Sequence, residues 1–211
     1  MESKNSETFK TWNDIALLYQ EKFMDLDLYN ETYDFVCKSV TKEKATLLEI
    51  GCGPGNITRY LLSKRPDFNI LGIDIAPNMI ELARQNVPAA RFEVMDCRHI
   101  NQLNSKFDAI IGGFCLPYLN SAEADELIAV ASDLLNEHGL LYLSFVEGDP
   151  ASSEFKTGGG GRVFFNYHIL EELQTKLAQH QFGDFTIFKV PYKTSDNTFD
   201  IHTILTAVRK G

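Results

Sequence analysis

The sequence contains only four cysteines among 211 residues, and no two of them have the spacing of a redox motif or a zinc site. It also lacks a run of about 18 apolar residues, the length that a membrane-spanning helix needs. Its first residues lack the apolar core of a signal peptide. From these absences we expect reduced thiols, no bound metal, no membrane partner and a cytoplasmic location.

Positive charge is scarce as well, because 20 lysines and arginines stand against 29 aspartates and glutamates, which gives a net charge of −9 at pH 7. A protein that binds nucleic acid electrostatically needs a basic surface, so we expect no nucleic-acid partner. A content of 44% hydrophobic and 23% charged residues is that of a globular chain. We predict a single domain over residues 1–211 and leave its oligomeric state open.

The pattern of apolar residues divides the chain into parts. Residues 1–41 favour a helical cap, with one amphipathic helix from Trp12 to Leu26 and a shorter one from Glu31 to Ser39. Over residues 42–146, short apolar runs alternate with helical stretches, which is typical of a parallel sheet with helices on both faces. Residues 167–211 carry a helix and two alternating runs joined by a polar turn, which predict an antiparallel strand pair.

The segment 147–166 follows the last predicted parallel strand and is long for a connection. Long connections at the active edge of a sheet often bind ligands, so we predict a mobile lid with aromatic residues facing the substrate. The alternative is a surface loop whose aromatic residues start the next helix or enter the core. Four consecutive glycines, residues 158–161, could also cradle a phosphate, but no lysine–hydroxyl pair follows them.

The strongest motif is LLEIGCGPGN, residues 47–56, in which an apolar run leads into a glycine-rich turn. Glycines let the backbone turn sharply and let a ligand approach the main-chain amides. A dinucleotide fingerprint has glycine at the sixth position of such a turn, where this chain has Asn56. The spacing therefore favours a nucleoside ligand without a pyrophosphate, and a tight turn without a ligand is the alternative.

Acidic residues end the next two predicted strands. Asp74 lies 23 positions after Gly51, where a carboxylate can accept both hydroxyls of a ribose. Asp96 could receive the exocyclic amine of adenine, with the main-chain amide of Cys97 at a ring nitrogen. The alternatives are a surface carboxylate or helix cap for Asp74, and an ordinary strand-end acid for Asp96.

Together these three features resemble the class I S-adenosylmethionine-dependent methyltransferases that act on small molecules. The resemblance covers about residues 42–208. It implies an α/β, three-layer Rossmann-like fold, in which a seven-stranded, mostly parallel sheet has helices on both faces and its antiparallel final strand inserted beside strand five. It also implies that S-adenosyl-L-methionine is the cofactor, with its methionine part at the glycine loop, its ribose at Asp74 and its adenine at Asp96.

The resemblance assigns further residues to the cofactor site. The segment FDAIIGGF, residues 107–114, matches the family's fourth motif, whose last residues line the methionine end. A tyrosine on the helix before the sheet often closes over that end, which here nominates Tyr19. The complete set of predicted cofactor-binding residues is Tyr19, Glu49, Gly51, Cys52, Gly53, Gly55, Asn56, Asp74, Ile75, Asp96, Cys97, Gly112, Gly113 and Phe114.

The implied reaction moves the sulfonium methyl group to an oxygen or nitrogen of a small-molecule substrate by in-line attack. The Asn/Asp-Pro-Pro-Tyr motif that amino-directed nucleic-acid methylases share is absent, and CLPY stands nearby at residues 115–118. The acid-rich metal site of catechol-type enzymes is absent too, so we expect no magnesium. His168, Tyr118 and Tyr19 are candidates for a general base, and none is favoured.

Three alternatives stay open. A nicotinamide-dependent oxidoreductase is one, because Gly51 and Asp74 also suit a dinucleotide. A protein that binds the cofactor without turnover is another, because the sequence identifies no base. The third is a metal or redox site, because Cys52, Cys97 and Cys115 all follow predicted strands, although no histidine accompanies them at ligand spacing.

Overall fold

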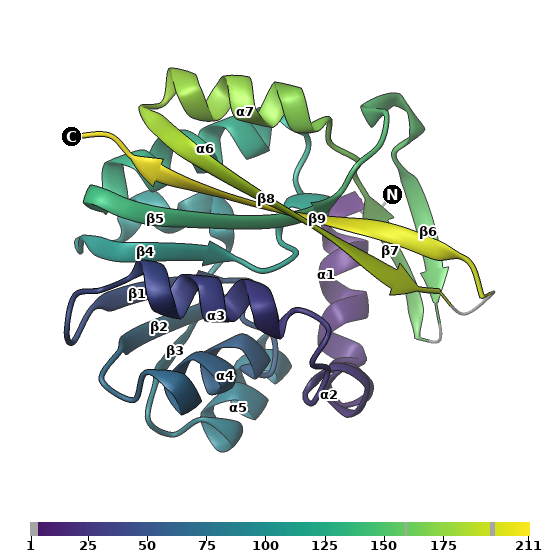
Figure 1. Cartoon of the computed structure of the whole chain (residues 1–211). Helices are drawn as coiled ribbons and strands as arrows, with labels where there is room; N and C mark the ends of the chain where they lie inside the picture. The colour runs from purple at the N-terminus through teal and green to yellow at the C-terminus, as the bar shows by residue number, and fades with distance from the viewer. Residues whose placement is uncertain (1–3, 159, 195–196) are drawn as a thin grey trace.

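The computed structural model describes residues 4–158, 160–194 and 197–211. Its centre is a seven-stranded sheet with the strand order β3-β2-β1-β4-β5-β9-β8 (Figure 1). Strands β1 to β5 pair in parallel, and β9 is antiparallel to both of its neighbours, as the sequence predicted. The strands are β1 (Thr46–Ile50), β2 (Asn69–Asp74), β3 (Arg91–Val94), β4 (Phe107–Gly112), β5 (Leu135–Val146), β8 (Phe182–Lys193) and β9 (Phe199–Arg209).

Helices cover both faces of this sheet, which is why its central strands consist of nearly continuous apolar residues. One face packs against α3 (Asn30–Ser39), α4 (Asn56–Lys64) and α5 (Pro77–Asn86). The other face packs against the 3-10 helix η1 (Cys97–Gln102), α6 (Ser121–Leu134) and α7 (Leu170–Gln179). The three-layer Rossmann-like fold is therefore confirmed.

The N-terminal segment forms two helices, α1 (Lys4–Asp14) and α2 (Ala16–Phe23), so the single helix predicted from Trp12 to Leu26 is wrong. The chain leaves helical geometry at Ile15, where φ is −99° and ψ is 14°. Main-chain hydrogen bonds of the helical type still join Ile15 to Thr11 and Tyr19 to Ile15. The apolar spacing therefore continues through the break and does not reveal it.

The described residues of the segment 147–166, which the sequence predicts to be a lid, form a short 3-10 helix and a β-hairpin. The hairpin glycines allow close packing on the N-terminal helices, since a Cβ added at Gly160 would lie 2.1 Å from Cγ2 of Ile15. Gly159, part of the predicted phosphate cradle, lies outside the described residues. The elements are η3 (Pro150–Ser152), β6 (Glu154–Gly158) and β7 (Gly161–Phe165).

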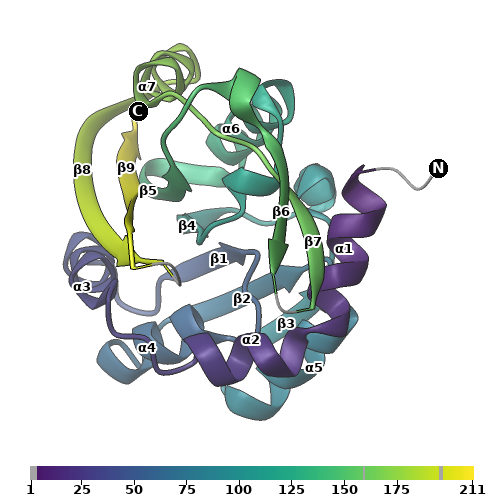
Figure 2. The same ribbon diagram turned by 90° about the vertical axis from the view of Figure 1, so that its right-hand side faces the viewer.

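Strand β7 lies along α1 in front of the carboxyl ends of the parallel strands (Figure 2). The hydroxyl of Thr11 donates to the carbonyl of Arg162 at 2.9 Å, and the amide of Phe164 donates to the hydroxyl of Thr8 at 2.9 Å. The hairpin and α1 thus form one cover over this edge of the sheet. Movement of the hairpin as a lid stays a prediction.

None of the described helices combines the length and the apolar composition that crossing a membrane requires.

Candidate active site

A pocket lies at the carboxyl edge of the parallel strands, under the cover formed by α1, α2 and β7. Its empty space, including the mouth that opens to solvent, is about 950 Å³. Parallel strands all end at the same edge of a sheet, so motifs that are far apart in the chain meet there. Eight of the fourteen predicted cofactor residues line this pocket: Tyr19, Gly51, Gly53, Asp74, Ile75, Asp96, Cys97 and Phe114.

The glycine-rich turn after β1 places two of its glycines in the pocket wall. Gly51, Gly53 and Gly55 have φ angles of 68°, 51° and 87°, a region that side chains with a Cβ rarely adopt. Gly55 lies beneath the turn, where an added Cβ would be 3.2 Å from Val87 of the neighbouring helical layer. The turn therefore needs its glycines for backbone shape, and Gly51 and Gly53 also allow close approach of a ligand.

Glu49, the residue before the end of β1, is fully buried beside this turn. Its Oε2 accepts a hydrogen bond from the hydroxyl of Thr58, whereas its Oε1 has no hydrogen-bond partner among the described residues. Burial raises the pKa of Glu49 to about 8. A buried carboxylate oxygen without a partner is destabilising on its own, so this position fits a ligand that brings a cationic donor such as an ammonium group.

Asp74 connects the end of β2 to the glycine-rich turn. Its Oδ2 accepts a hydrogen bond from the amide of Gly53 at 3.0 Å, and its Oδ1 accepts one from the amide of Ala76 at 2.8 Å. Burial raises the pKa of Asp74. The side chain does not cap α5, which begins at Pro77. Each carboxylate oxygen can accept a second hydrogen bond, so Asp74 can still receive ligand hydroxyls.

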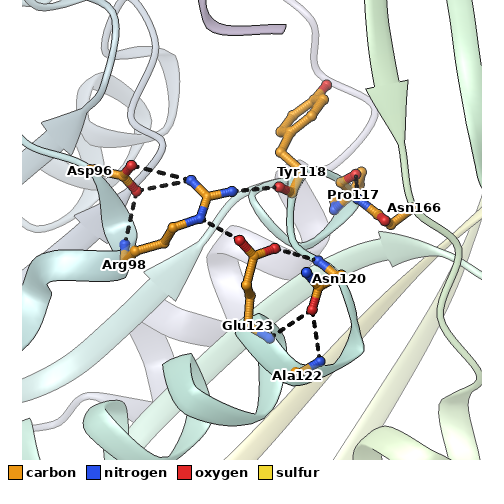
Figure 3. A network of polar contacts seen from close by, with 8 residues as sticks. All are labelled: Asp96, Arg98, Pro117, Tyr118, Asn120, Ala122, Glu123 and Asn166. Atoms are coloured by element: carbon orange, nitrogen blue, oxygen red, sulfur yellow. Dashed lines mark hydrogen bonds and ion pairs between the residues drawn. The ribbon is translucent and has the colours of Figure 1, made fainter. Parts of the chain in front are cut away.

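Asp96 lines the pocket and also belongs to a polar network around Arg98 (Figure 3). It caps η1 by accepting a hydrogen bond from the amide of Arg98 at 2.9 Å, and its Oδ1 lies 3.1 Å from the guanidinium. The same guanidinium donates to Glu123 at 2.7 Å and to the carbonyl of Tyr118 at 3.1 Å. Asp96 is therefore a structural cap and a pocket residue at once.

The other six predicted residues lie outside the pocket lining. Gly113 is needed for packing, because an added Cβ would lie 2.4 Å from Cδ1 of Ile57. A Cβ added at Gly112 would lie 2.9 Å from both Sγ of Cys115 and Cδ2 of Leu143. Contact of these six residues with a cofactor stays a prediction. They are Glu49, Cys52, Gly55, Asn56, Gly112 and Gly113.

The three candidate bases do not suit that role. His168 is buried, and its Nε2 forms a hydrogen bond with the carbonyl of Leu116 at 2.9 Å, which requires that nitrogen to carry a proton. Tyr19 and Tyr118 line the pocket, but burial raises the pKa of both hydroxyls well above neutral. Nε2 of His168 is thus not free to accept a proton, and both tyrosine hydroxyls keep their protons near neutral pH.

Aromatic side chains from the N-terminal helices form the roof of the pocket. Tyr19 is a predicted site residue, whereas Trp12 and Phe9 could not be recognised from the sequence. Trp12 of α1 lies edge-on to Tyr19 and Tyr118, with ring centroids 5.6 Å and 5.7 Å apart. Phe9 of α1 and Phe164 of β7 line the same space. The apolar face of residues 12–26 was visible in the sequence, but nothing local indicated that it covers a ligand site.

A second cluster that sequence reasoning missed surrounds His202 of β9. Because β9 is antiparallel, it begins at the edge where the parallel strands end, and His202 pairs with Val146 at the end of β5. The Nδ1 of His202 lies 2.6 Å from the hydroxyl of Tyr29. Its ring stacks on Tyr192 at 4.7 Å and contacts Phe114, a pocket residue, at 4.8 Å.

The cysteines show no metal or redox arrangement within the ranges that the structure describes. No group of three or more His, Cys, Asp or Glu side chains in those ranges is arranged to hold a metal ion. All four cysteines are unpaired, and burial raises the pKa of the thiols of Cys52, Cys97 and Cys115. Thiols held in the protonated form are poor nucleophiles and poor metal ligands.

Helices cover both faces of the parallel sheet, and a glycine-rich turn and strand-end acids surround one pocket. This arrangement is typical of an α/β protein of the nucleoside-binding type. A family model described as "Methyltransferase domain" matches residues 47–139, from β1 through the beginning of β5. The matched segment contains the glycine-rich turn and both strand-end acids. Two glycines of that turn and both acids line the pocket.

Similar proteins agree with that match. A putative methyltransferase of Invertebrate iridescent virus 6 is 26% identical over 90% of this chain and 74% of its own length. A malonyl-[acyl-carrier protein] O-methyltransferase of Acetivibrio thermocellus is 38% identical, but over only 38% of this chain and 29% of that enzyme. The solved structure of the 1,6-didemethyltoxoflavin-N1-methyltransferase of Burkholderia thailandensis has a TM-score of 0.72 at 17% identity, over 96% and 87% of the two chains.

The matched segment and the similar proteins support assignment of the chain to the class I S-adenosylmethionine-dependent methyltransferases. The nicotinamide-dependent alternative is thereby set aside.

Proposed function

We propose that the protein transfers the methyl group of S-adenosyl-L-methionine to an oxygen or nitrogen of a small-molecule substrate by in-line displacement. The observation that carries this proposal is the covered pocket at the carboxyl edge of the sheet. The glycine-rich turn, the strand-end acids and the aromatic residues of the roof all line this one pocket. When bound, the cofactor supplies a methyl group on a positively charged sulfur, which is a good leaving group.

Five residues are suited to hold the cofactor. The unpaired Oε1 of Glu49 and the turn at Gly53 suit the amino-acid end, because an ammonium group would satisfy the buried carboxylate. Asp74 suits the ribose hydroxyls, since its carboxylate lies in the pocket wall at the end of β2. Asp96 and the amide of Cys97 suit the adenine, at the end of β3.

The cover over the pocket favours a small substrate. Thr8 and Thr11 of α1 hold the hairpin through the 2.9 Å hydrogen bonds to β7, so the two elements enclose the space above the strand ends. Relatives support this, since trans-aconitate 2-methyltransferases and malonyl-[acyl-carrier protein] O-methyltransferases are among the similar proteins.

The chain's contribution to the reaction is alignment and exclusion of water. Phe114 and Tyr19 line the pocket, and the resemblance assigns both to its methionine end, where rigid aromatic rings would restrict the positions that a substrate can adopt. Holding two reactants in the attacking geometry can lower a barrier by up to about 7–11 kcal/mol. A substrate that still carries a proton on its attacking atom needs a base in addition.

Titration calorimetry with S-adenosyl-L-methionine tests the cofactor assignment. The variant Asp74→Asn should bind about 10-fold to 100-fold more weakly than the wild type, because hydrogen bonds to a charged group contribute about 1.5–3 kcal/mol. The exposed Asp133→Asn is the matched control and should bind like the wild type. No binding by the wild type, or equal binding by Asp74→Asn, would contradict the assignment.

A second assay tests the substrate class. Methyl-labelled cofactor is supplied with fractions of small molecules, with RNA and with protein, and the label is followed. Incorporation into small molecules is expected, whereas exclusive labelling of RNA or protein would overturn the proposal.

A further inference from the structure

Arg98 is a charged residue of the pocket wall to which the proposed reaction assigns no role. Among the described residues that line the pocket, it is the sole cation. Its guanidinium lies between the carboxylates of Asp96 and Glu123 (Figure 3). Because Asp96 belongs to the same wall, the contacts of Arg98 determine how the carboxylate of Asp96 is presented to a ligand.

The carboxylate of Asp96 accepts three hydrogen bonds from Arg98. Its Oδ1 accepts from the main-chain amide at 2.9 Å and from Nη1 at 3.1 Å, and its Oδ2 accepts from Nη1 at 3.2 Å. A carboxylate offers about four acceptor positions, so one position, on Oδ2, is left for an N–H group of a ligand. The thiol of Cys97 also interacts with this carboxylate, but a thiol is a weak donor that a ligand amine can displace.

A helix cap alone would not need the guanidinium. The amide of Arg98 already donates to Oδ1 of Asp96, and this bond completes the cap of η1. The guanidinium adds a contact to Oδ2, the oxygen that takes no part in the cap. The last torsion of an aspartate side chain is broad, so this second contact is what stops the carboxylate from turning.

The guanidinium is itself fixed by two further elements. Its Nε donates to Oε1 of Glu123 at 2.7 Å, and its Nη2 donates to the carbonyl of Tyr118 at 3.1 Å. Oε2 of Glu123 accepts a hydrogen bond from the amide of Asn120 at 2.8 Å, as part of the capping box at the start of α6. The start of α6 therefore supports Asp96 through Arg98.

Burial distinguishes this network from a surface ion pair. The side chains of Arg98, Asp96 and Glu123 are 25%, 21% and 22% exposed. Arg91 and Glu93 also form a pair two positions apart, but their side chains are 80% and 42% exposed. Exposed pairs are screened by water and contribute little, whereas partly buried pairs with several charge-assisted hydrogen bonds keep a defined geometry.

We propose that Arg98 is a positioning residue, which fixes the carboxylate of Asp96 so that the pocket selects a purine base with an exocyclic amino group. This inference rests on the proposed function, which assigns the adenine of the cofactor to Asp96. The acceptor position left on Oδ2 matches one N–H donor. A carbonyl oxygen at the same place on the base would face an ionised carboxylate, which has no proton to donate to it.

A matched pair of ligands tests this selection. S-adenosylhomocysteine and S-inosylhomocysteine share the ribose and the amino-acid end, but the base of the first carries an amino group where the second has a carbonyl. In calorimetry the wild type should bind S-adenosylhomocysteine about 10-fold to 100-fold more tightly, because a site built for a hydrogen bond rejects a ligand that cannot form it. Equal affinities overturn the selection, whereas binding of neither ligand contradicts the proposed function itself.

The variant Arg98→Gln tests the positioning. The ratio of the two dissociation constants should fall about fivefold or more, because residues of one hydrogen-bond network are coupled and the carboxylate of Asp96 becomes free to turn. A merely structural role would weaken the binding of both ligands equally and leave the ratio as it is. An unchanged or larger ratio therefore overturns the assignment.

A double variant tests whether Arg98 acts through Asp96. The ratio of the dissociation constants should be the same in Asp96→Ala and in Asp96→Ala combined with Arg98→Gln, because Arg98 has no carboxylate left to position. A ratio that differs between these two proteins would mean that Arg98 contacts the base directly, and it would overturn the positioning role.

The matched control is Arg91→Gln, which removes an exposed arginine from a pair with the same two-residue spacing. Its ratio should equal that of the wild type. If Arg98→Gln fails to fold, Arg98→Lys is measured in its place, since lysine keeps the charge but lacks the rigid fork that holds three partners at once. A wild-type ratio in either folded variant of Arg98 overturns the proposal.

Discussion

The buried carboxyl of Glu49 makes a quantitative prediction about stability. In the unfolded chain its pKa is near the ordinary value of 4.5, and in the folded protein burial raises the pKa to about 8. The folded state therefore holds a proton between these values that the unfolded state has released. It follows that this residue's contribution to stability is complete below pH 4.5 and is lost as the pH rises towards 8.

The size of the effect follows from proton linkage. Where one state is protonated and the other is not, the free energy of unfolding falls by about 1.4 kcal/mol per pH unit. Between pH 5.5 and pH 7.5, Glu49 should thus lower the free energy of unfolding by about 3 kcal/mol, since both values lie between the two pKa values. For a domain of this size, that change corresponds to a melting temperature lower by about 6–12 °C.

The assay compares thermal unfolding of the cofactor-free wild type and Glu49→Gln at the two pH values. Glutamine keeps the shape of the side chain and can still accept the hydrogen bond from Thr58, but it does not titrate. The melting temperature of Glu49→Gln should rise relative to that of the wild type as the pH increases. The exposed Glu81→Gln is the matched control, and its difference from the wild type should be the same at both pH values. An equally constant difference for Glu49→Gln would refute the reasoning.

Three further predictions concern the pocket and its cover. Cofactor binding near pH 7 should release protons, because an ammonium group beside Glu49 favours the ionised form of this carboxyl group. Calorimetry in buffers of different ionisation enthalpy measures the number of protons released, and proton uptake would contradict the prediction. Gly113→Ala should destabilise the protein by about 1–3 kcal/mol in chemical denaturation, because its Cβ would overlap Ile57; an unchanged midpoint would count against this packing. Thr11→Val should accelerate hydrogen exchange in the hairpin, since the bond to Arg162 is lost, and unchanged exchange would show that this bond does not hold the hairpin.

The sheet could be predicted from the sequence because its strands are covered on both faces. Leu47, Leu48 and Ile50 are at most 1% exposed, so β1 is a nearly continuous apolar run followed by glycines. The strand-end acids Asp74 and Asp96 could be placed in one pocket for a topological reason, since parallel strands share a carboxyl edge.

The hairpin could not be placed in the same way, because its structure depends on distant contacts. Thr11 and Arg162, which join α1 to β7, are 151 positions apart in the chain. A local signal did exist, since Phe155 and Phe164 face each other across two short runs separated by glycines, a pattern typical of hairpins.

His202 was missed for a similar reason. In the sequence it is one of five histidines without any motif, and only the antiparallel direction of β9 brings it to the edge where the pocket lies. The partner that orients it, Tyr29, lies 173 positions away. A topological argument was available, because an antiparallel final strand must begin where the parallel strands end.

The central claim is that the carboxyl-edge pocket holds S-adenosylmethionine through Glu49 and Asp74. The most direct measurement is a crystal structure of the complex with S-adenosylhomocysteine. The account predicts the amino group within hydrogen-bond distance of Oε1 of Glu49 and the ribose hydroxyls at the carboxylate of Asp74. A ligand bound outside this pocket, or one that leaves Oε1 of Glu49 without a partner, would contradict the account.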